Sequence, residues 1–475
     1  MYIRKIVLFL ALCAAMSFAN LPLPLQPNIH RTADRDSVFR LELQTNSAFW
    51  EPQNLTFRAR MDAAFSENVD QSGRVILYFI DSIGNDYLQL VFSGFFDNRA
   101  VHGRTVDWAR PGDRSDTGSR STFDLYRAFL TFTPNEYIKI GLGKEYYNWG
   151  PSELGGLMLS DYNTGFVGLY QQYQIGPFTI RGLATQLSSQ EWREPPGNGY
   201  LDNHIMPIHR FFSAGRIEFY RELWGLALKQ AIIYGGVNRS FEIPYLIPIF
   251  PFHYAQMSNW RYGNWGSNTL VGLDAYANFL DKNLQIYGEL LVDDFQMDED
   301  DASKSIQNLI GFVAGTRFNI PNILYGFFEG GQINSFVYNS MSGDLGRYLN
   351  RDAFIGSPLG PDNQLFWGKL GRHFERIGLR TELYFWLLRQ GERDINLRYN
   401  HNYLLGTRND RIPYGNVRRE TATWLSAIYE FKHNTVELYG GIQNFRTEGV
   451  SGTSKTSPFF GLSLNAAIGL GWNAR

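Results

Sequence analysis

The hydrophobic residues near the carboxyl end of the chain recur at every second position. From Phe460 to Trp472 the even positions are all apolar, whereas the odd positions hold glycine, serine, asparagine or alanine. A period of two is typical of a β-strand with one apolar face and one face of small or polar groups. The run also exceeds the roughly 9 to 11 residues that a tilted strand needs to cross a bilayer. The segment therefore predicts a membrane-spanning strand.

The same alternation recurs upstream, and the connections between the alternating runs are short and long in turn. The predicted short turns are Asp81–Asn85, Pro134–Asn135, Gly176–Pro177, Arg221–Glu222, Asp281–Asn283, Asn319–Asn322, Gln390–Asp394 and Lys432–Asn434. The predicted long loops are Asn98–Ser121, Tyr146–Gly165, Leu187–Arg210, Asn238–Asn268, Asp294–Gln307, Val337–His373, Thr407–Glu420 and Gly449–Pro458. Bacterial outer-membrane barrels join their strands by short periplasmic turns and long extracellular loops. We therefore predict an all-β, antiparallel transmembrane barrel of about 18 strands.

The amino terminus has the features of an export signal. Arg4 and Lys5 precede the apolar run Ile6–Met16, and Ser17–Ala19 supplies the small residues of a cleavage site. We expect residues 1–19 to be a signal peptide, residues 20–53 an N-terminal periplasmic or plug segment, and residues 54–475 the barrel. Cleavage would remove Cys13, the sole cysteine, so the mature chain would contain no disulfide.

Composition supports export to the cell outer membrane of a Gram-negative-type bacterium. Aromatic residues make up 16% of the chain, which fits two interfacial girdles. After residue 19 no apolar run is long enough for a helical span, and the mean hydropathy is −0.27. The net charge of −2 gives no reason to expect a nucleic-acid partner. An exported soluble β protein remains the alternative.

Several segments in the middle of the chain resemble one known family. They are Tyr146–Pro151, Leu159–Asp161, His209–Arg210, Ile233–Gly235, Tyr245–Pro248, Leu273–Asp274, Tyr287–Glu289 and Asp293–Phe295. Through their order and spacing, these segments resemble the Wzi-like capsule assembly outer-membrane proteins. The resemblance covers roughly residues 120 to 300. The resemblance implies an eighteen-stranded barrel that binds capsular polysaccharide at the cell surface.

The predicted topology places all of these segments at the extracellular rim, where they would form one binding site. Its aromatic members are Tyr146, Tyr147 and Trp149, beside Asn148, and an aromatic ring can stack on the apolar face of a sugar. Gly150 and Pro151 would fix a tight chain reversal, and Asp161 is assigned a structural or orienting role. The alternative is that these aromatic side chains anchor the interfacial girdle.

Basic residues supply the second part of the predicted polysaccharide site. His209 and Arg210 open a strand, and an arginine fork pairs well with a uronic acid carboxylate. The stretch Lys369–Arg419 holds eleven basic and five acidic residues. Its arginines predicted to face outward are Arg372, Arg408, Arg411, Arg418 and Arg419, whereas Arg389 and Arg393 fall at a predicted periplasmic turn. These arginines can alternatively pair with acids of the barrel or with lipopolysaccharide phosphates.

The acidic residues do not assemble into a catalytic site in the sequence. Glu289 and Asp293 share inward parity, but four residues of strand separate them by roughly 13 Å, beyond the roughly 5 to 9.5 Å of glycosidase carboxylates. The run Asp293–Asp301 lacks EF-hand spacing, so whether it binds calcium stays open. We assign Glu289, Asp293 and Asp294 an orienting role, and expect no enzyme activity, no cofactor and no metal site.

These observations leave two hypotheses for function. The first is a monomeric barrel that binds capsular or other surface polysaccharide and helps to attach or assemble the capsule. The second is a porin or oligosaccharide channel, because a barrel of eighteen strands is wide enough for an aqueous lumen. The expected partners are the polysaccharide, outer-membrane lipid and lipopolysaccharide, and the barrel insertion machinery.

Overall fold

The computed structural model describes most of the chain from Leu55 to Leu470. The described residues are 55–66, 74–84, 87–97, 100–101, 104–105, 122–161, 165–192, 206–237, 239–261, 266–294, 307–340, 345–350, 353–395, 407, 410–431 and 434–470. The predicted signal peptide and the predicted segment 20–53 lie outside these residues. Among the described helices, none has the length and apolar character needed to cross a membrane.

Eighteen strands form one antiparallel sheet. They are β1 (Leu55–Ser66), β2 (Arg74–Gly84), β3 (Leu88–Asp97), β6 (Thr122–Asn135), β7 (Ile138–Glu145), β8 (Phe166–Ile175), β9 (Phe178–Trp192), β10 (Met206–Tyr220), β11 (Trp224–Val237), β12 (Ser267–Phe279), β13 (Leu284–Asp294), β14 (Leu309–Ile320), β15 (Leu324–Ile333), β18 (Asn363–Phe374), β19 (Leu379–Gln390), β20 (Arg418–Phe431), β21 (Asn434–Thr447) and β22 (Lys455–Leu470). The connections contain the short strands β4 (Ala100–Val101), β5 (Arg104–Thr105), β16 (Leu349–Asn350) and β17 (Ala353–Phe354), the 3-10 helices η2 (Ile243–Leu246) and η4 (Glu375–Ile377), and the helix α3 (Phe252–Arg261).

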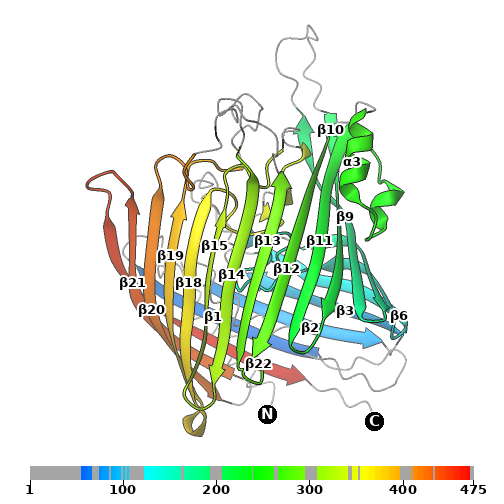
Figure 1. The fold of residues 1–475 in the computed structure, drawn as a ribbon. Helices are drawn as coiled ribbons and strands as arrows, with labels where there is room; N and C mark the ends of the chain where they lie inside the picture. Colours follow the sequence, from blue (N-terminus) through cyan, green and yellow to red (C-terminus); the bar gives the residue numbers. More distant parts are fainter. Residues whose placement is uncertain are drawn as a thin grey trace, which may run out of the picture.

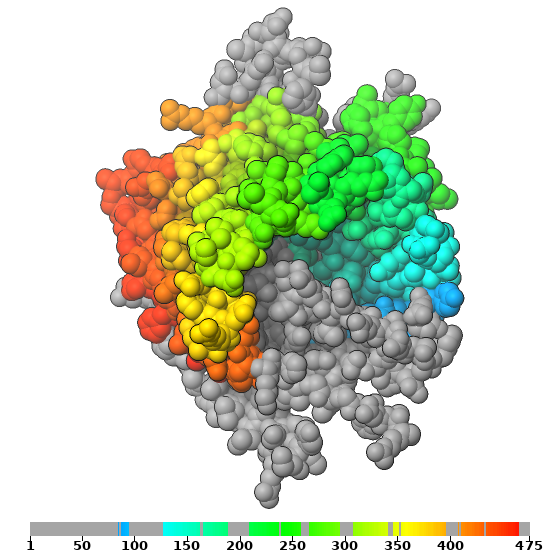
Figure 2. All heavy atoms as spheres, turned by 60° about the horizontal axis from the view of Figure 1, so that its bottom comes forward, coloured from blue at the N-terminus to red at the C-terminus, as the bar shows by residue number. Residues whose placement is uncertain are grey.

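The sheet closes on itself. Strand β1 pairs with β2 on one side and with β22 on the other, where Leu55 lies opposite Leu470 and Ser66 opposite Phe459. Closure leaves no unpaired strand edge, which is the condition for a sheet to span a bilayer. Figure 1 shows the short turns at one end of the barrel and the long connections at the other, and Figure 2 shows the wall curving around a hollow. The predicted eighteen-stranded outer-membrane barrel is confirmed.

The two faces of the strands differ as the alternation predicts. In β22, Phe460 is 55% exposed on the lipid side, whereas Phe459 is 4% exposed on the side of the lumen. In β11, Leu226 and Leu228 are exposed, whereas Lys229 between Leu228 and Gln230 is buried toward the lumen. Along each strand, side chains therefore point alternately to the bilayer and to the interior.

One predicted turn was wrong, and the predicted long loop Val337–His373 contains most of strand β18. The sequence reading placed a short turn at Gln390–Asp394, but the structure places it at η4, between β18 and β19, and Gly378 there has the left-handed φ of 62° that a tight reversal requires. The described residues 391–395, 407 and 410–417 instead belong to the connection between β19 and β20. Arg372 consequently lies near the short-turn end, whereas Arg389 and Arg393 lie at the opposite end, which reverses their predicted sides.

The largest apolar cluster lies inside the barrel rather than within its wall. It joins inward side chains of the wall to two connections that fold into the lumen and to Ile395 of a third connection. We call residues 146–161, between β7 and β8, the first inward segment, and the described residues of 334–362, between β15 and β18, the second inward segment. Met158 and Leu159 of the first and Tyr338 and Tyr348 of the second are fully buried. Together they narrow the lumen.

A charge on the lipid face should destabilise this barrel strongly. Leu425 is exposed in the middle of β20. We expect Leu425→Arg to lower the free energy of unfolding in lipid vesicles by about 2 to 4 kcal/mol, because the guanidinium would enter the apolar layer. Guanidinium-induced unfolding followed by tryptophan fluorescence measures this change. Val450→Arg, in the exposed connection after β21, is the matched control, and equal stability of the two variants would contradict the assignment of the lipid face.

Candidate functional site

The first inward segment is held in the lumen by side chains that bind its main chain. The Lys229 ammonium group donates to the carbonyl oxygen of Trp149 at 3.1 Å, and the guanidinium of Arg317 donates to the carbonyl oxygen of Pro151. The main chain of the segment also donates to the wall, since the amide of Leu157 donates to Glu289 Oε1 at 2.9 Å. The segment also closes on itself, since the amide of Trp149 donates to the carbonyl oxygen of Leu159 at 2.8 Å. Strands β11, β13 and β14 thus hold one connection.

Glu329 of β15 binds the same segment more extensively. Its buried carboxylate accepts hydrogen bonds from Ser152 Oγ at 2.9 Å and from the amide of Glu153 at 2.7 Å. It also accepts from the Tyr287 hydroxyl at 2.8 Å and from Trp367 Nε1 at 3.0 Å. Four donors from the segment and from two neighbouring parts of the wall therefore converge on one carboxylate. Such saturation stabilises a buried charge.

A chain of ion pairs extends from this site along the lumen. Lys229 contacts Glu289 and lies 3.0 Å from Asp274 Oδ2. Asp274 lies 3.2 Å from the guanidinium of Arg216, whose Nε lies 2.6 Å from Glu218. Glu218 also lies 3.3 Å from Arg181. The chain of ion pairs alternates in sign across β9 to β13, so each buried charge has an opposite partner.

The second inward segment closes over the first. The hydroxyl of Tyr338 donates to the carbonyl oxygen of Leu157 at 2.6 Å, and that of Tyr348 donates to the carbonyl oxygen of Met158 at 2.8 Å. Burial raises the pKa of both phenols, which keeps them protonated as donors. The amide of Ser160 donates to the carbonyl oxygen of Ile355 at 2.8 Å. The two segments therefore form one hydrogen-bonded layer.

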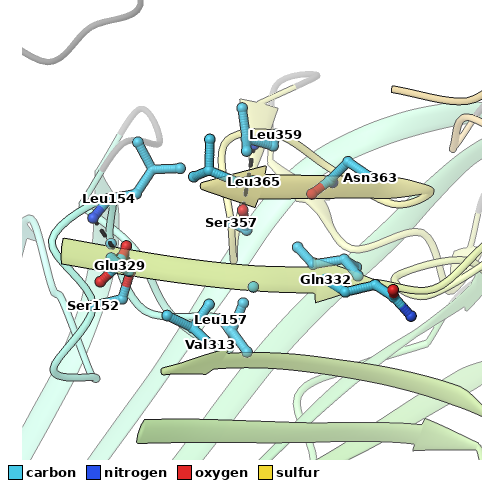
Figure 3. Close-up of a pocket in the computed structure, with 13 residues that line it drawn as sticks. Ser152, Leu154, Leu157, Val313, Glu329, Gln332, Ser357, Leu359, Asn363 and Leu365 are labelled. Atoms are coloured by element: carbon cyan, nitrogen blue, oxygen red, sulfur yellow. Dashed lines mark hydrogen bonds between the residues drawn. The ribbon is translucent and has the colours of Figure 1, made fainter. Parts of the chain in front are cut away.

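Figure 3 shows a pocket at the junction of the two segments with the wall. Ser152 and Leu157 of the first segment border it together with Glu329 of β15. Ser357 and Leu359 of the second segment border it on another side. The rest of the lining is mainly apolar, apart from the amide side chains of Gln332 and Asn363, and the Glu329 carboxylate already accepts from four donors. The pocket is therefore a packing gap in the narrowed part of the lumen.

Toward the short-turn end, the lumen is lined by arginines that keep substantial exposure. The side chains of Arg181, Arg317 and Arg380 are 35%, 36% and 31% exposed, and each lies within four residues of a short turn. Their inward direction follows from the alternation of their strands. A second buried carboxylate, Glu382, accepts from the Tyr325 hydroxyl at 2.7 Å and lies 3.2 Å from the Lys369 ammonium group. This end of the lumen is polar and accessible.

The predicted aromatic site does not lie at the rim. Trp149 is 3% exposed within the interior cluster, and Tyr147 stacks on Tyr170 with ring centroids 5.4 Å apart. Tyr146 is half-buried, and Asn148 accepts a hydrogen bond from the amide of Gly156 at 2.7 Å. These groups organise the first inward segment, so the prediction of an exposed stacking platform was wrong.

The residues predicted to shape or orient that site instead fit the segment to the wall. A Cβ at Gly150 would overlap the Glu289 carboxylate, so glycine permits this close approach. Pro151 receives the Arg317 hydrogen bond through its carbonyl oxygen, and Asp161 is half-buried at the end of the segment. Asp293 accepts from the amide of Tyr338 at 2.7 Å, whereas Asp294 is half-buried at the end of β13.

The predicted basic residues are not brought together. His209 and Arg210 point to opposite faces of β10, His209 being exposed and Arg210 buried. Arg210 Nε donates to the carbonyl oxygen of Leu345 at 3.2 Å, which anchors the second inward segment. Arg372 lies near the short turn at η4, Arg411 is exposed in the long connection before β20, and Arg408 lies outside the described residues.

One loop carboxylate connects the second inward segment to that long connection. Asp362 accepts from Ser335 Oγ at 2.8 Å and from the amides of Arg393 and Tyr414, both at 3.0 Å. Burial raises the pKa of Asp362 above its ordinary value, and these three donors partly offset that effect. The long connections at this end are therefore joined through their main chains.

The most important lumen residues were missed in the sequence reading. Lys229 and Glu329 were given no role, and Asp274 was noted only as part of the family-like segment Leu273–Asp274. Each of the three nevertheless interrupts an apolar strand with a charge of inward parity. The same parity identified Glu289 as inward. Parity applied to every charged residue of the strands would have found these side chains, because a charge on the other face would meet lipid.

Comparison with known proteins gives no family membership. No protein-family model and no curated protein matches the chain. Among solved structures, OprD of Pseudomonas aeruginosa is 7% identical over 90% of this chain and 96% of its own, with a TM-score of 0.48. OccD3 (OpdP) of Pseudomonas aeruginosa is 8% identical over 89% and 93%, and OccAB2 of Acinetobacter baumannii is 10% identical over 90% and 100%, both with TM-scores of 0.49. At these values the likeness carries no conclusion about activity.

The predicted Wzi-like family and the capsule-binding function nevertheless require correction. The three solved structures named above are OprD and Occ proteins, not capsule assembly proteins. Moreover, Trp149 and Arg210, which carried the resemblance, are buried and hold the inward segments in place. The predictions of a Wzi-like family and of capsular polysaccharide binding were therefore wrong.

Proposed function

We propose that the chain is a channel of the outer membrane that conducts small hydrophilic solutes through a narrowed lumen, without catalysis. The main observation that supports this proposal is the partial exposure of Arg181, Arg317 and Arg380 on the inner face of the wall. A guanidinium keeps such exposure only where water reaches it, since a dry lumen would impose a large desolvation cost. These residues therefore favour an aqueous lumen.

The two inward segments set the size of what passes. An eighteen-stranded barrel without obstruction would leave a wide aqueous channel. Here the first segment is bound by Lys229, Glu289, Arg317 and Glu329, and the second segment packs against it. A fixed obstruction of this kind favours small solutes and a small conductance.

Reconstitution into a planar bilayer tests this function. We expect discrete, steady conductance steps in potassium chloride that are smaller than those of an unobstructed eighteen-stranded barrel. Folding is checked on the same preparation by heat-modifiable migration, and heat-unfolded protein is the control. Folded, inserted protein that produces no conductance steps would overturn the proposal.

A further inference from the structure

The connection between β11 and β12 folds back over the outside of the barrel. We call its residues 239–261, which contain η2 and α3, the outer flap. Figure 1 shows α3 on the flank of the wall, where α3 contacts β11 and β12 and η2 contacts β9 and β10. Pro248 of the flap packs on Gly182 of β9 and Gly215 of β10, where an added Cβ would overlap it. Neighbours of both glycines, Arg181 and Arg216, point into the lumen. Because adjacent residues of a strand point to opposite faces, both glycines lie on the outer face of the wall, and Pro248 contacts the barrel from outside.

The flap covers polar side chains of the outward wall. Gln230 Nε2 donates to the carbonyl oxygens of Pro248 at 3.0 Å and Phe250 at 2.7 Å, and Gln230 Oε1 accepts from the amide of Phe252 at 3.1 Å. Gln171 Nε2 donates to the carbonyl oxygen of Leu246 at 3.1 Å. The outward-facing amides thus exchange hydrogen bonds with the main chain of the flap.

These amides lie at the depth of the bilayer. Gln230 is six residues above Trp224, the first residue of β11, which is about 20 Å along the strand and about 15 Å along the membrane normal at the usual tilt. The apolar band of such a barrel is about 25 Å tall, so Gln230 falls within it. Without the flap, a polar amide would face acyl chains.

The opposite side of the flap exposes mainly apolar side chains, with Ser240 and His253 as exposed polar residues. Phe252 and Tyr245 pack inward on Ile232 and Tyr234 of the wall. The outward residues are Ile243, Ile247, Ile249, Tyr254 and Met257, of which Ile243 and Tyr254 are 73% exposed. Prolines at 244, 248 and 251 remove three amide donors, and the amides of Tyr245, Ile247 and Phe250 donate within the flap. Irregular backbone in contact with lipid requires such internal pairing.

We propose that the outer flap is a lipid-binding surface that contacts the acyl chains of the outer leaflet. Its exposed face continues the lipid-facing surface of the wall, where Leu226 and Leu228 of β11 and Val271 of β12 are exposed beside it. The flap buries the polar wall residues and replaces them with isoleucine, tyrosine and methionine. This inference rests on the membrane-spanning fold and is independent of the channel proposal.

Quenching of single fluorescent labels tests the proposal. Ile249→Cys and Tyr254→Cys are made in a Cys13→Ser background, labelled with bimane and reconstituted in phosphatidylcholine vesicles. Chain-brominated phosphatidylcholine should quench both labels at least half as strongly as a label at Leu228→Cys in the wall. Aqueous iodide should quench them several-fold less than a label at Arg411→Cys, in an exposed connection.

Two further variants separate the flap from the wall beneath it. Gly215→Val should displace Pro248 and shift the Ile249 label from lipid quenching toward iodide quenching. Gly288→Val is the matched control, because Gly288 also lies on the outward face of its strand, β13. The nearest atom to a Cβ added there, the carbonyl oxygen of Val313, is 3.5 Å away, so the wider space tolerates the side chain. Iodide quenching of Ile249 and Tyr254 equal to that of Arg411 would overturn the proposal. Shielding from both quenchers, with cross-linking between copies of the chain, would overturn it in favour of a protein interface.

Discussion

Replacing Glu329 with leucine is expected to release the first inward segment and to raise the single-channel conductance several-fold. The change removes the acceptor of Ser152 Oγ, the Glu153 amide, the Tyr287 hydroxyl and Trp367 Nε1. A buried donor left unpaired costs about 1 to 3 kcal/mol, and here four donors lose their acceptor together. The segment should then leave its wall site, because its amide and hydroxyl groups find water elsewhere in the lumen.

Single-channel recording in planar bilayers measures this effect, and heat-modifiable migration confirms that the barrel has formed. The matched control is Glu222→Leu, which removes an equivalent charge from an exposed short turn, where Glu222 pairs with Lys282. Unchanged conductance in a folded Glu329→Leu barrel would show that the segment does not limit the current. Failure of the variant to insert is separated from this outcome by Glu329→Gln, which retains an acceptor oxygen and should conduct nearly as the original chain does.

The strand alternation predicted the fold because the bilayer imposes it on every strand independently. Phe460 and Ser463 show the rule in one strand, with the apolar ring exposed to lipid and the hydroxyl group buried on the lumen side. Each strand adds the same signal, and closure follows because an open edge would leave backbone groups unpaired in lipid. The architecture could therefore be predicted from the local alternation together with the requirement that every backbone polar group be paired inside the bilayer.

The misplaced turn shows where local pattern becomes ambiguous. Gly391 and Asp394 have turn-forming chemistry, but long connections use the same residues as short turns. The true turn, Glu375–Gly378, contains Ile377, which continues the apolar period of the strand that follows. Only Gly378 marks the reversal, and glycine also occurs within many strands of this barrel.

The inward folding of the two segments was not predictable from the same pattern. The wall residues that hydrogen-bond to residues 149–157 come from β11, β13, β14 and β15, which are more than 70 residues away in the chain. One signal was available, since Leu154, Leu157, Met158 and Leu159 make this connection too apolar for an extracellular loop. Such residues need a buried environment, and the lumen was the place that the barrel offered.

Exchanging the Lys229–Glu289 pair for apolar residues should separate barrel stability from channel width. Glu289→Leu alone leaves the buried ammonium of Lys229 with Asp274 and removes the acceptor of the Leu157 amide. Lys229→Met alone leaves two buried carboxylates, Asp274 and Glu289, without their shared cation. Breaking a buried pair costs about 3 to 5 kcal/mol, whereas replacing both partners by apolar groups is often neutral. We therefore expect each single variant to unfold at lower denaturant concentration and the double variant to recover most of that loss.

Conductance should not recover with stability. In the double variant Asp274 keeps Arg216 as its partner, so the wall regains balanced charge. The first inward segment, however, still lacks the donor to the Trp149 carbonyl oxygen and the acceptor of the Leu157 amide. Unfolding titrations in lipid vesicles and single-channel recordings on the same four proteins test both statements. Additive losses of stability would exclude coupling between Lys229 and Glu289, and a double variant with the original conductance would mean that Glu329 and Arg317 alone hold the segment.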